Sequence, residues 1–134
     1  MISNMKKVLI DTHVWLWALE GNSRLPLKMV DILNDEDAQI LLSAISVWEL
    51  AMLVEKKKYQ LSQGLRKFLA EARQVLPCKE IAITSEISLL SRELEFNHND
   101  PSDRFIAATA KLYDVPLMTC DEKLKGLCFL DIVS

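Results

Sequence analysis

Hydrophobic residues along this chain follow two different periods. Short runs of β-branched residues and leucine predict buried strands, and longer stretches with apolar residues at every third or fourth position predict helices. The predicted strands are residues 6–10, 39–43, 80–83, 115–119 and 128–132. The predicted helices are residues 13–19, 26–34, 46–58, 62–76, 85–94, 101–113 and 122–125. Because strands that alternate with helices form right-handed crossovers, we expect an α/β fold with three α/β/α layers around a central, mainly parallel sheet of four to five strands.

The clearest helix start lies within residues 98–108 and is acidic. Asp100 suits the cap position and Pro101 the first helical position. Asp103 falls in the first turn, where the positive end of the helix dipole favours a carboxylate. From Phe105 onward the pattern is apolar nearly all round, which predicts a helix buried among neighbouring elements.

Two other helices carry specific expectations. Ser46 and Glu49 match a Ser-x-x-Glu capping box, which predicts that the third helix begins near Ser46. The inward-facing residues expected for the helix of residues 26–34 are Leu27, Val30, Ile32 and Leu33.

Length and composition indicate an ordinary globular protein. Its 134 residues fit one domain, residues 1–134, with residues 1–4 as a candidate N-terminal extension. The formal net charge of −3 argues against binding duplex DNA through a broad basic face.

Three cysteines without Cys-x-x-Cys spacing suggest neither a disulfide framework nor a zinc site, so we expect small core residues in a reducing cytoplasm. The N-terminal apolar run is too short for a signal peptide or a membrane span, which predicts a cytoplasmic protein without a membrane partner.

Carboxylates stand where predicted strands end and predicted helices begin. They are Asp11, Glu49, Asp103 and Asp121, with Asp100 as a fifth nearby. In a parallel sheet such positions meet beyond the carboxyl ends of the strands, where ligands bind. Crowded anions need a counter-ion, and oxygen ligands without a Cys or His set indicate Mg²⁺ or Mn²⁺ rather than zinc. Each acid taken alone could equally be a helix cap, and both interpretations stay open at this point.

Other chemistry has weaker support. His13 and His98 could act as general bases, but two unrelated histidines more often fix loops. Arg104 is expected to pair with a nearby acid rather than to clamp a phosphate. An aspartyl-phosphate phosphatase needs a second aspartate two residues after the first, where this chain has His13. The sequence also contains no glycine-rich phosphate loop and no Gly-x-Ser-x-Gly motif.

Four segments together resemble the PIN-domain proteins, and more narrowly the VapC-type toxins of type II toxin–antitoxin systems. The segments are residues 8–13, 43–49, 98–108 and 117–121, which follow the family's order over essentially the whole chain. The four acids of the family match Asp11, Glu49, Asp103 and Asp121. Thr119 fills the family's hydroxyl position before the last acid. Asp100 matches an additional acid of the His-x-Asp-Pro-x-Asp-Arg subgroup, as a metal ligand or only as a cap.

This resemblance implies a PIN-like fold and an endoribonuclease that uses Mg²⁺, for which Mn²⁺ can substitute. It implies in-line attack of water on an RNA phosphodiester, leaving 5′-phosphate and 3′-hydroxyl ends. Asp11, Asp103 and Asp121 would bind the metal, and Glu49 would bind it or orient the attacking water. The implied partners are an RNA substrate, a second copy in a homodimer and a cognate antitoxin. The alternative is a non-catalytic RNA- or protein-binding module on the same fold.

Overall fold

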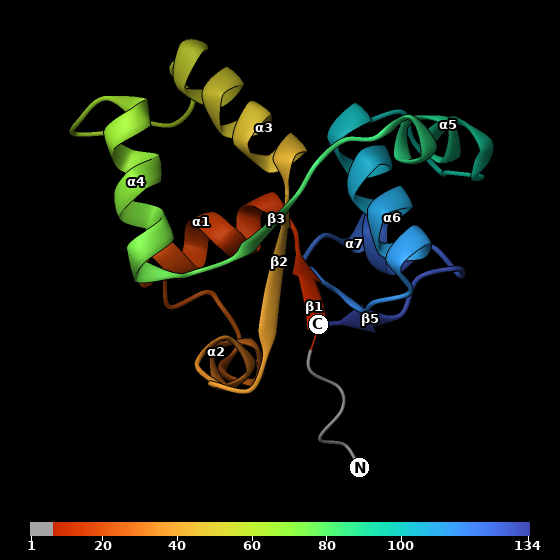
Figure 1. Ribbon diagram of the computed structural model, residues 1–134, viewed down its shortest axis with the longest axis horizontal. Coiled ribbons are helices and arrows are strands. Elements are labelled where there is room, and N and C mark those ends of the chain that lie inside the picture. The colour runs from red at the N-terminus through yellow and green to blue at the C-terminus, as the bar shows by residue number, and fades with distance from the viewer. Residues whose placement is uncertain (1–6) are drawn as a thin grey trace.

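The computed structural model describes residues 7–134, which form a five-stranded sheet between two layers of helices (Figure 1). The strands are β1 (Lys7–Ile10), β2 (Gln39–Ser43), β3 (Lys79–Ile81), β4 (Leu117–Met118) and β5 (Ile132–Val133). They lie in the order β3-β2-β1-β4-β5, and every neighbouring pair is parallel. The predicted three-layer α/β/α fold is confirmed. The candidate extension at residues 1–4 lies outside the described residues.

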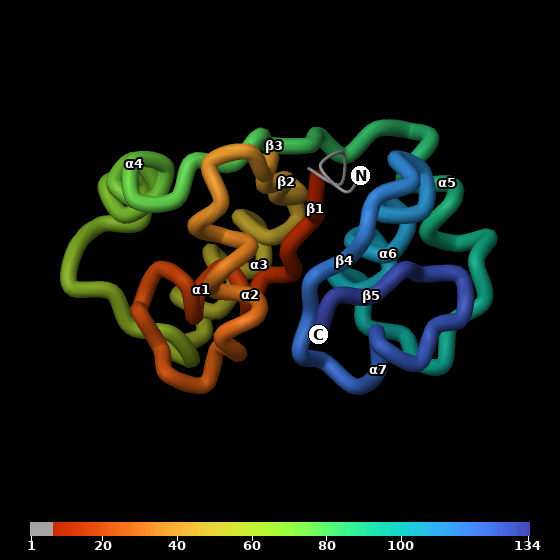
Figure 2. The backbone as a smooth tube through the Cα atoms, turned by 90° about the horizontal axis from the view of Figure 1, so that it is seen from below, coloured from red at the N-terminus to blue at the C-terminus, as the bar shows by residue number. Residues whose placement is uncertain are grey.

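Helices cover both faces of the sheet. The helices are α1 (Thr12–Glu20), α2 (Leu27–Leu33), α3 (Ala44–Glu55), α4 (Leu65–Val75), α5 (Ser85–Glu93), α6 (Pro101–Tyr113) and α7 (Glu122–Lys125). Both views show α1 to α4 on one side of the strands and α5 to α7 on the other (Figure 1 and Figure 2). Across residues 7–134, no helix combines the length and the apolar character that a membrane crossing requires.

Alternation along the strands divides the core in two. Val8 and Ile10 of β1 point into a cluster with residues of α1 to α4, whereas Leu9 points into a second cluster with α5, α6 and α7. Their exposed fractions are 1% or less, so β1 is buried on both faces. This burial explains the continuous apolar run that marks β1 in the sequence, because a strand covered on both sides has no solvent face to alternate with.

The helix of residues 101–113 is found as predicted, whereas the capping box at Ser46 is wrong. Ser43 caps α3 instead, because its extended backbone lets Oγ accept a hydrogen bond from the Ile45 N–H at 3.1 Å. Ser46 is fully buried in the first turn, where its Oγ accepts a hydrogen bond from the Thr12 hydroxyl at 2.8 Å. The chain therefore passes from β2 into α3 without an intervening loop.

Several element bounds also differ from the predictions. The fourth strand is limited to Leu117–Met118, and the last strand is Ile132–Val133 rather than residues 128–132. The predicted strand segment around Cys128 is a turn, and Cys128 is exposed instead of belonging to the core. Leu27 is 79% exposed, so its place in an apolar helical pattern did not bury it. In each case the segment is short and its conformation and orientation depend on tertiary packing, which periodicity cannot specify.

We expect Leu124→Ala to lower the free energy of unfolding by about 2–4 kcal/mol, because it would leave a cavity among buried side chains. Leu124 is 0% exposed although it belongs to α7, a helix of only 4 residues. Chemical denaturation followed by circular dichroism would measure the loss. Leu27→Ala is the matched control and should change stability by less than about 0.5 kcal/mol. Equal effects of the two substitutions would contradict the packing of α7 against the core.

Candidate active site

The structure brings the predicted acids together in one small hollow. Its lining residues are Asp11, Thr12, His13, Glu49, Asp100, Asp103, Ile106 and Asp121, around a volume of about 50 Å³. The hollow lies where β1 and β4 end and where α1, α6 and α7 begin. Residues more than a hundred positions apart thus meet at the carboxyl edge of the sheet, the edge at which ligands bind in open α/β folds.

Asp11 is the most rigidly held of these acids. It follows β1 directly, caps α1 and is 4% exposed. Its Oδ1 accepts a hydrogen bond from the Val14 N–H at 2.8 Å, and its Oδ2 accepts one from the Thr119 hydroxyl. Burial raises the pKa of Asp11, and the bonds from Thr119 and Val14 oppose that rise only in part. Asp11 therefore has a fixed orientation and an unfavourable negative charge.

Asp100 and Asp121 also cap helices, as one of the two interpretations left open by the sequence has it. Oδ1 of Asp100 accepts from the Asp103 N–H at 3.1 Å at the start of α6. Oδ1 of Asp121 accepts from the Lys123 N–H at 2.9 Å at the start of α7. Each cap uses one carboxylate oxygen, and the second oxygen of each remains a potential ligand.

Asp103 is affected by the negative charge of all the other acids in the hollow. Its pKa is raised to about 7, first by burial and then by the charges of the other four acids. The other four are Asp100, Asp121, Glu49 and Asp11, in decreasing order of effect. A carboxyl group with such a pKa is partly protonated at neutral pH, so the hollow does not accommodate a full set of negative charges by itself.

Glu49 joins the hollow from α3 through a neighbour that sequence reasoning did not single out. Burial raises the pKa of Glu49, and a hydrogen bond with Thr12 lowers it. The same Thr12 hydroxyl is hydrogen-bonded to the Ser46 hydroxyl at 2.8 Å, so this residue links the start of α1 to the first turns of α3. The available signal was a hydroxyl residue directly after Asp11 in an otherwise apolar stretch.

The donor set fits a hard divalent cation. Carboxylate oxygens dominate the hollow, and the raised pKa of Asp103 reflects an excess of negative charge that a cation would relieve. In the part of the chain that the structure describes, however, no three His, Cys, Asp or Glu side chains are placed so that they could bind one ion. A cation would therefore bind by drawing the carboxylates inward rather than by entering a finished cage.

Among residues 7–134, Arg104 forms no ion pair with an acid, so the expectation that it would is wrong. Its guanidinium donates to the Ser91 carbonyl at 3.0 Å and to Asn99 Oδ1 at 3.3 Å. It also lies over the Phe96 ring, 4.5 Å from the centroid. Because all these partners lie in α5 or in the loop between α5 and α6, Arg104 holds that loop against α6 and is not free to clamp a phosphate.

The two histidines lie at different depths. His13 is exposed and lines the hollow, and its positive charge lowers the pKa values of Asp11 and Glu49. His98 is mostly buried beside α6, with Nδ1 accepting from the Asp100 N–H at 3.1 Å. Neither environment alone identifies a general base, which leaves the interpretation as loop-fixing residues in place for His98.

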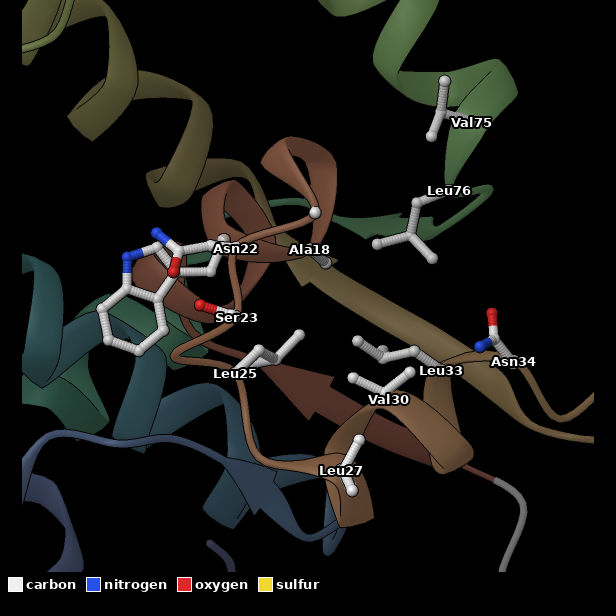
Figure 3. Close-up of a pocket in the computed structure, with 12 residues that line it drawn as sticks. Ala18, Asn22, Ser23, Leu25, Leu27, Val30, Leu33, Asn34, Val75 and Leu76 are labelled. Atoms are coloured by element: carbon white, nitrogen blue, oxygen red, sulfur yellow. The ribbon is translucent and has the colours of Figure 1, made fainter.

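A second hollow, of about 480 Å³, shares no lining residue with the acidic hollow. Figure 3 shows the residues that line it. Its walls come from the end of α1, from α2 and the loop before it, and from the end of α4. The lining includes Leu25, Leu27, Val30, Leu33 and Val75 but no ionisable side chain. This groove is larger than the acidic hollow, but of the two only the acidic hollow has ionisable groups that can act on a substrate.

Comparison with known proteins gives the family. A PIN domain model matches residues 8–130. Ribonuclease VapC22 of Mycobacterium tuberculosis (strain ATCC 25618 / H37Rv) is 30% identical over 123 residues, covering 91% of this chain and 92% of that protein. The crystal structure of VapBC2 from Rickettsia felis, bound to a promoter DNA fragment, is similar with a TM-score of 0.68 and 18% identity. That match covers 95% of this chain and 97% of the other.

A toxin–antitoxin complex from Klebsiella pneumoniae is also similar, with a TM-score of 0.66 and 22% identity over 95% of this chain and 96% of the other. At these identities the solved structures support the fold, whereas the domain match and VapC22 define the relationship in sequence. Since the domain match extends from β1 to the segment before β5, this chain belongs to the PIN-domain family.

Proposed function

We propose that this protein is an endoribonuclease that depends on Mg²⁺ or Mn²⁺ and serves as the toxin of a type II toxin–antitoxin pair. The observation that carries the proposal is the raised pKa of Asp103, about 7, among four other carboxylates in one hollow. Five acids at a sheet edge destabilise the fold unless a cation balances them, so their presence favours a metal-dependent function. The 30% identity to a protein named as a ribonuclease supports RNA as the substrate.

In this proposal Asp11, Asp103 and Asp121 hold the cation, with Glu49 as a further ligand or as the base that orients the attacking water. Asp100 caps α6 and has one oxygen free for the same cation. When bound, a divalent cation lowers the pKa of the attacking water and neutralises charge that develops on the phosphate. The fixed orientation of Asp11, set by Val14 and Thr119, gives the site one immobile ligand around which the others arrange.

The acids also explain why the cation should be required even for substrate binding. An RNA phosphate that approaches the hollow meets negative charge from every side, and burial strengthens that repulsion. The alternative of a non-catalytic RNA-binding module is therefore disfavoured, because an acidic hollow without a cation repels the ligand that such a module would bind. A protein-binding module remains the competing function that the cleavage experiment tests.

A cognate antitoxin is the proposed protein partner, and the similar solved structures include toxin–antitoxin complexes. The groove between α2 and α4 offers this partner an apolar surface, since Leu27 is 79% and Val75 is 69% exposed. An apolar segment of the antitoxin would bury these side chains, and a basic side chain would suit the acidic hollow. We further propose a homodimer that acts in the cytoplasm.

We expect purified protein to cleave a mixed pool of structured RNAs with Mg²⁺ or Mn²⁺ and not with EDTA. Asp103→Asn should reduce the cleavage rate at least about a hundredfold, because it removes a charged ligand from the cation. Gel analysis of 5′-labelled RNA would measure both effects. Asp31→Asn, on the exposed side of α2, is the matched control and should retain the wild-type rate. Folded protein that cleaves no RNA with either metal would favour the protein-binding module.

The stability of the metal-free protein should depend on pH through Asp103. Its folded pKa of about 7 lies above the ordinary value of 3.8, so the folded state binds the proton more tightly than the unfolded state. Stability should then fall as pH rises from about 4 to about 7. Asp103→Asn should stabilise the protein at pH 8 by on the order of 2 kcal/mol and have little effect at pH 4.

Urea denaturation in EDTA at several pH values would measure this difference, with Asp31→Asn as the uncharged control at an exposed site. A stabilisation by Asp103→Asn that is the same at pH 4 and pH 8 would contradict a buried, charge-strained Asp103. An unchanged stability at pH 8 would show that water or rotation of the side chain already relieves the repulsion.

Light scattering of the purified protein should give twice the mass of one chain. The expectation rests on exposed apolar side chains away from the groove, since Trp48 is 50% and Tyr113 is 46% exposed. Exposed aromatic side chains are enriched at contact surfaces between subunits. A mass equal to one chain at all protein concentrations would remove the homodimer from the proposal.

A further inference from the structure

The His98 ring has one nitrogen satisfied and one without a partner. Nδ1 accepts a hydrogen bond from the Asp100 backbone N–H at 3.1 Å. Nε2 is buried and has no hydrogen-bond partner. Asp103 Oδ2 lies 3.4 Å from Nε2, a distance within hydrogen-bonding reach although the atoms are not aligned for such a bond. The side chains are only 13% (His98) and 16% (Asp103) exposed, so solvent has little access to this contact.

These contacts specify the tautomer of His98. A ring nitrogen that accepts a backbone N–H cannot itself carry a proton, so Nδ1 is unprotonated. The neutral ring then carries its proton on Nε2, which faces the Asp103 carboxylate. Among residues 7–134 the approach of His98 is the one polar side-chain contact recorded for that carboxylate. A buried N–H without an acceptor is unfavourable, and a small rotation of Asp103 would satisfy it.

We propose that His98 is a positioning residue for Asp103, which its Nε2–H holds by one oxygen so that the other oxygen is available to the divalent cation. The proposal rests on the proposed function in one respect, that Asp103 is a metal ligand. Carboxylate ligands of metals are commonly fixed by hydrogen bonds from outside the coordination sphere, and loss of such a bond weakens metal binding by about 10–100-fold. His98 acts through Asp103 and does not touch the substrate.

The surrounding loop is built to keep His98 in this place. Arg104 fastens the loop between α5 and α6 through Ser91, Asn99 and the Phe96 ring. The bond from the Asp100 N–H to Nδ1 then fixes the ring relative to the start of α6. A single ring therefore connects the backbone of one acid to the side chain of another. This arrangement accounts for the His-x-Asp-Pro-x-Asp-Arg order of residues 98–104.

The tautomer can be tested without activity or metal. Long-range ¹H–¹⁵N correlation spectra of the full, ¹⁵N-labelled chain in EDTA report which ring nitrogen carries the proton. The chain has only two histidines, and His13→Gln assigns the signals. We expect His98 to be protonated on Nε2 alone. A proton on Nδ1, or a ring that averages between tautomers, would overturn the proposal.

Two substitutions then test the acceptor role of Nδ1 and the donor role of Nε2 separately. His98→Asn retains an acceptor near the Nδ1 position for the Asp100 N–H and removes the donor to Asp103. His98→Gln keeps a donor near the Nε2 position. Isothermal titration with Mn²⁺ should give His98→Asn a Kd about tenfold higher than wild type, with a metal-free Tm close to wild type. His98→Gln should bind Mn²⁺ more tightly than His98→Asn.

The outcomes distinguish this inference from the proposed function. Mn²⁺ affinity of His98→Asn equal to wild type would overturn the positioning role while leaving metal-dependent cleavage intact. A wild-type chain that binds no Mn²⁺ would contradict the proposed function, and the spectra would still decide the contact between His98 and Asp103. If His98→Asn fails to fold, the comparison of His98→Gln with wild type and the tautomer of the wild-type ring carry the test.

Discussion

Repulsion among carboxylates in a partly buried hollow is the constraint on which the site depends. The pKa of Asp103 shows this repulsion, because every other acid of the hollow raises it. The fold opposes this repulsion with oriented N–H groups at helix starts, which donate to Asp11, Asp100 and Asp121. The positive ends of the α1 and α6 dipoles act in the same direction. The N–H groups and helix dipoles stabilise the carboxylates without neutralising them. The negative charge that is left can attract a cation.

Strand order determines where the acids come together. Because β1 lies between β2 and β4, the chain segments after β1 and β4 emerge side by side, and Thr119 can reach Asp11. Clusters on both faces of the sheet hold β1 rigidly, whereas Glu49 and Asp103 enter from helices and are less buried. The site thus combines one acid that is fixed at the end of a buried strand with others that lie on helices and are more exposed.

The fold could be predicted largely because β1 and β2 are short apolar runs and α6 begins with unmistakable capping residues. The juxtaposition of the acids also followed from their positions at the ends of elements. Ser46 and Arg104 were misjudged, since local motifs suggested a cap and an ion pair while tertiary packing gave a buried hydroxyl and a loop clamp. The tautomer of His98 was beyond reach, because it depends on a loop conformation that no periodicity encodes.

The capping role of Asp11, Asp100 and Asp121 has a consequence for how such a site can change over generations. Asparagine caps a helix as well as aspartate does, so replacing any of these acids by its amide preserves the fold while removing a charge. Aspartate and asparagine codons differ at a single nucleotide. The lineage can therefore lose these charges one at a time without passing through an unstable intermediate, and the rest of the molecular surface stays as it was.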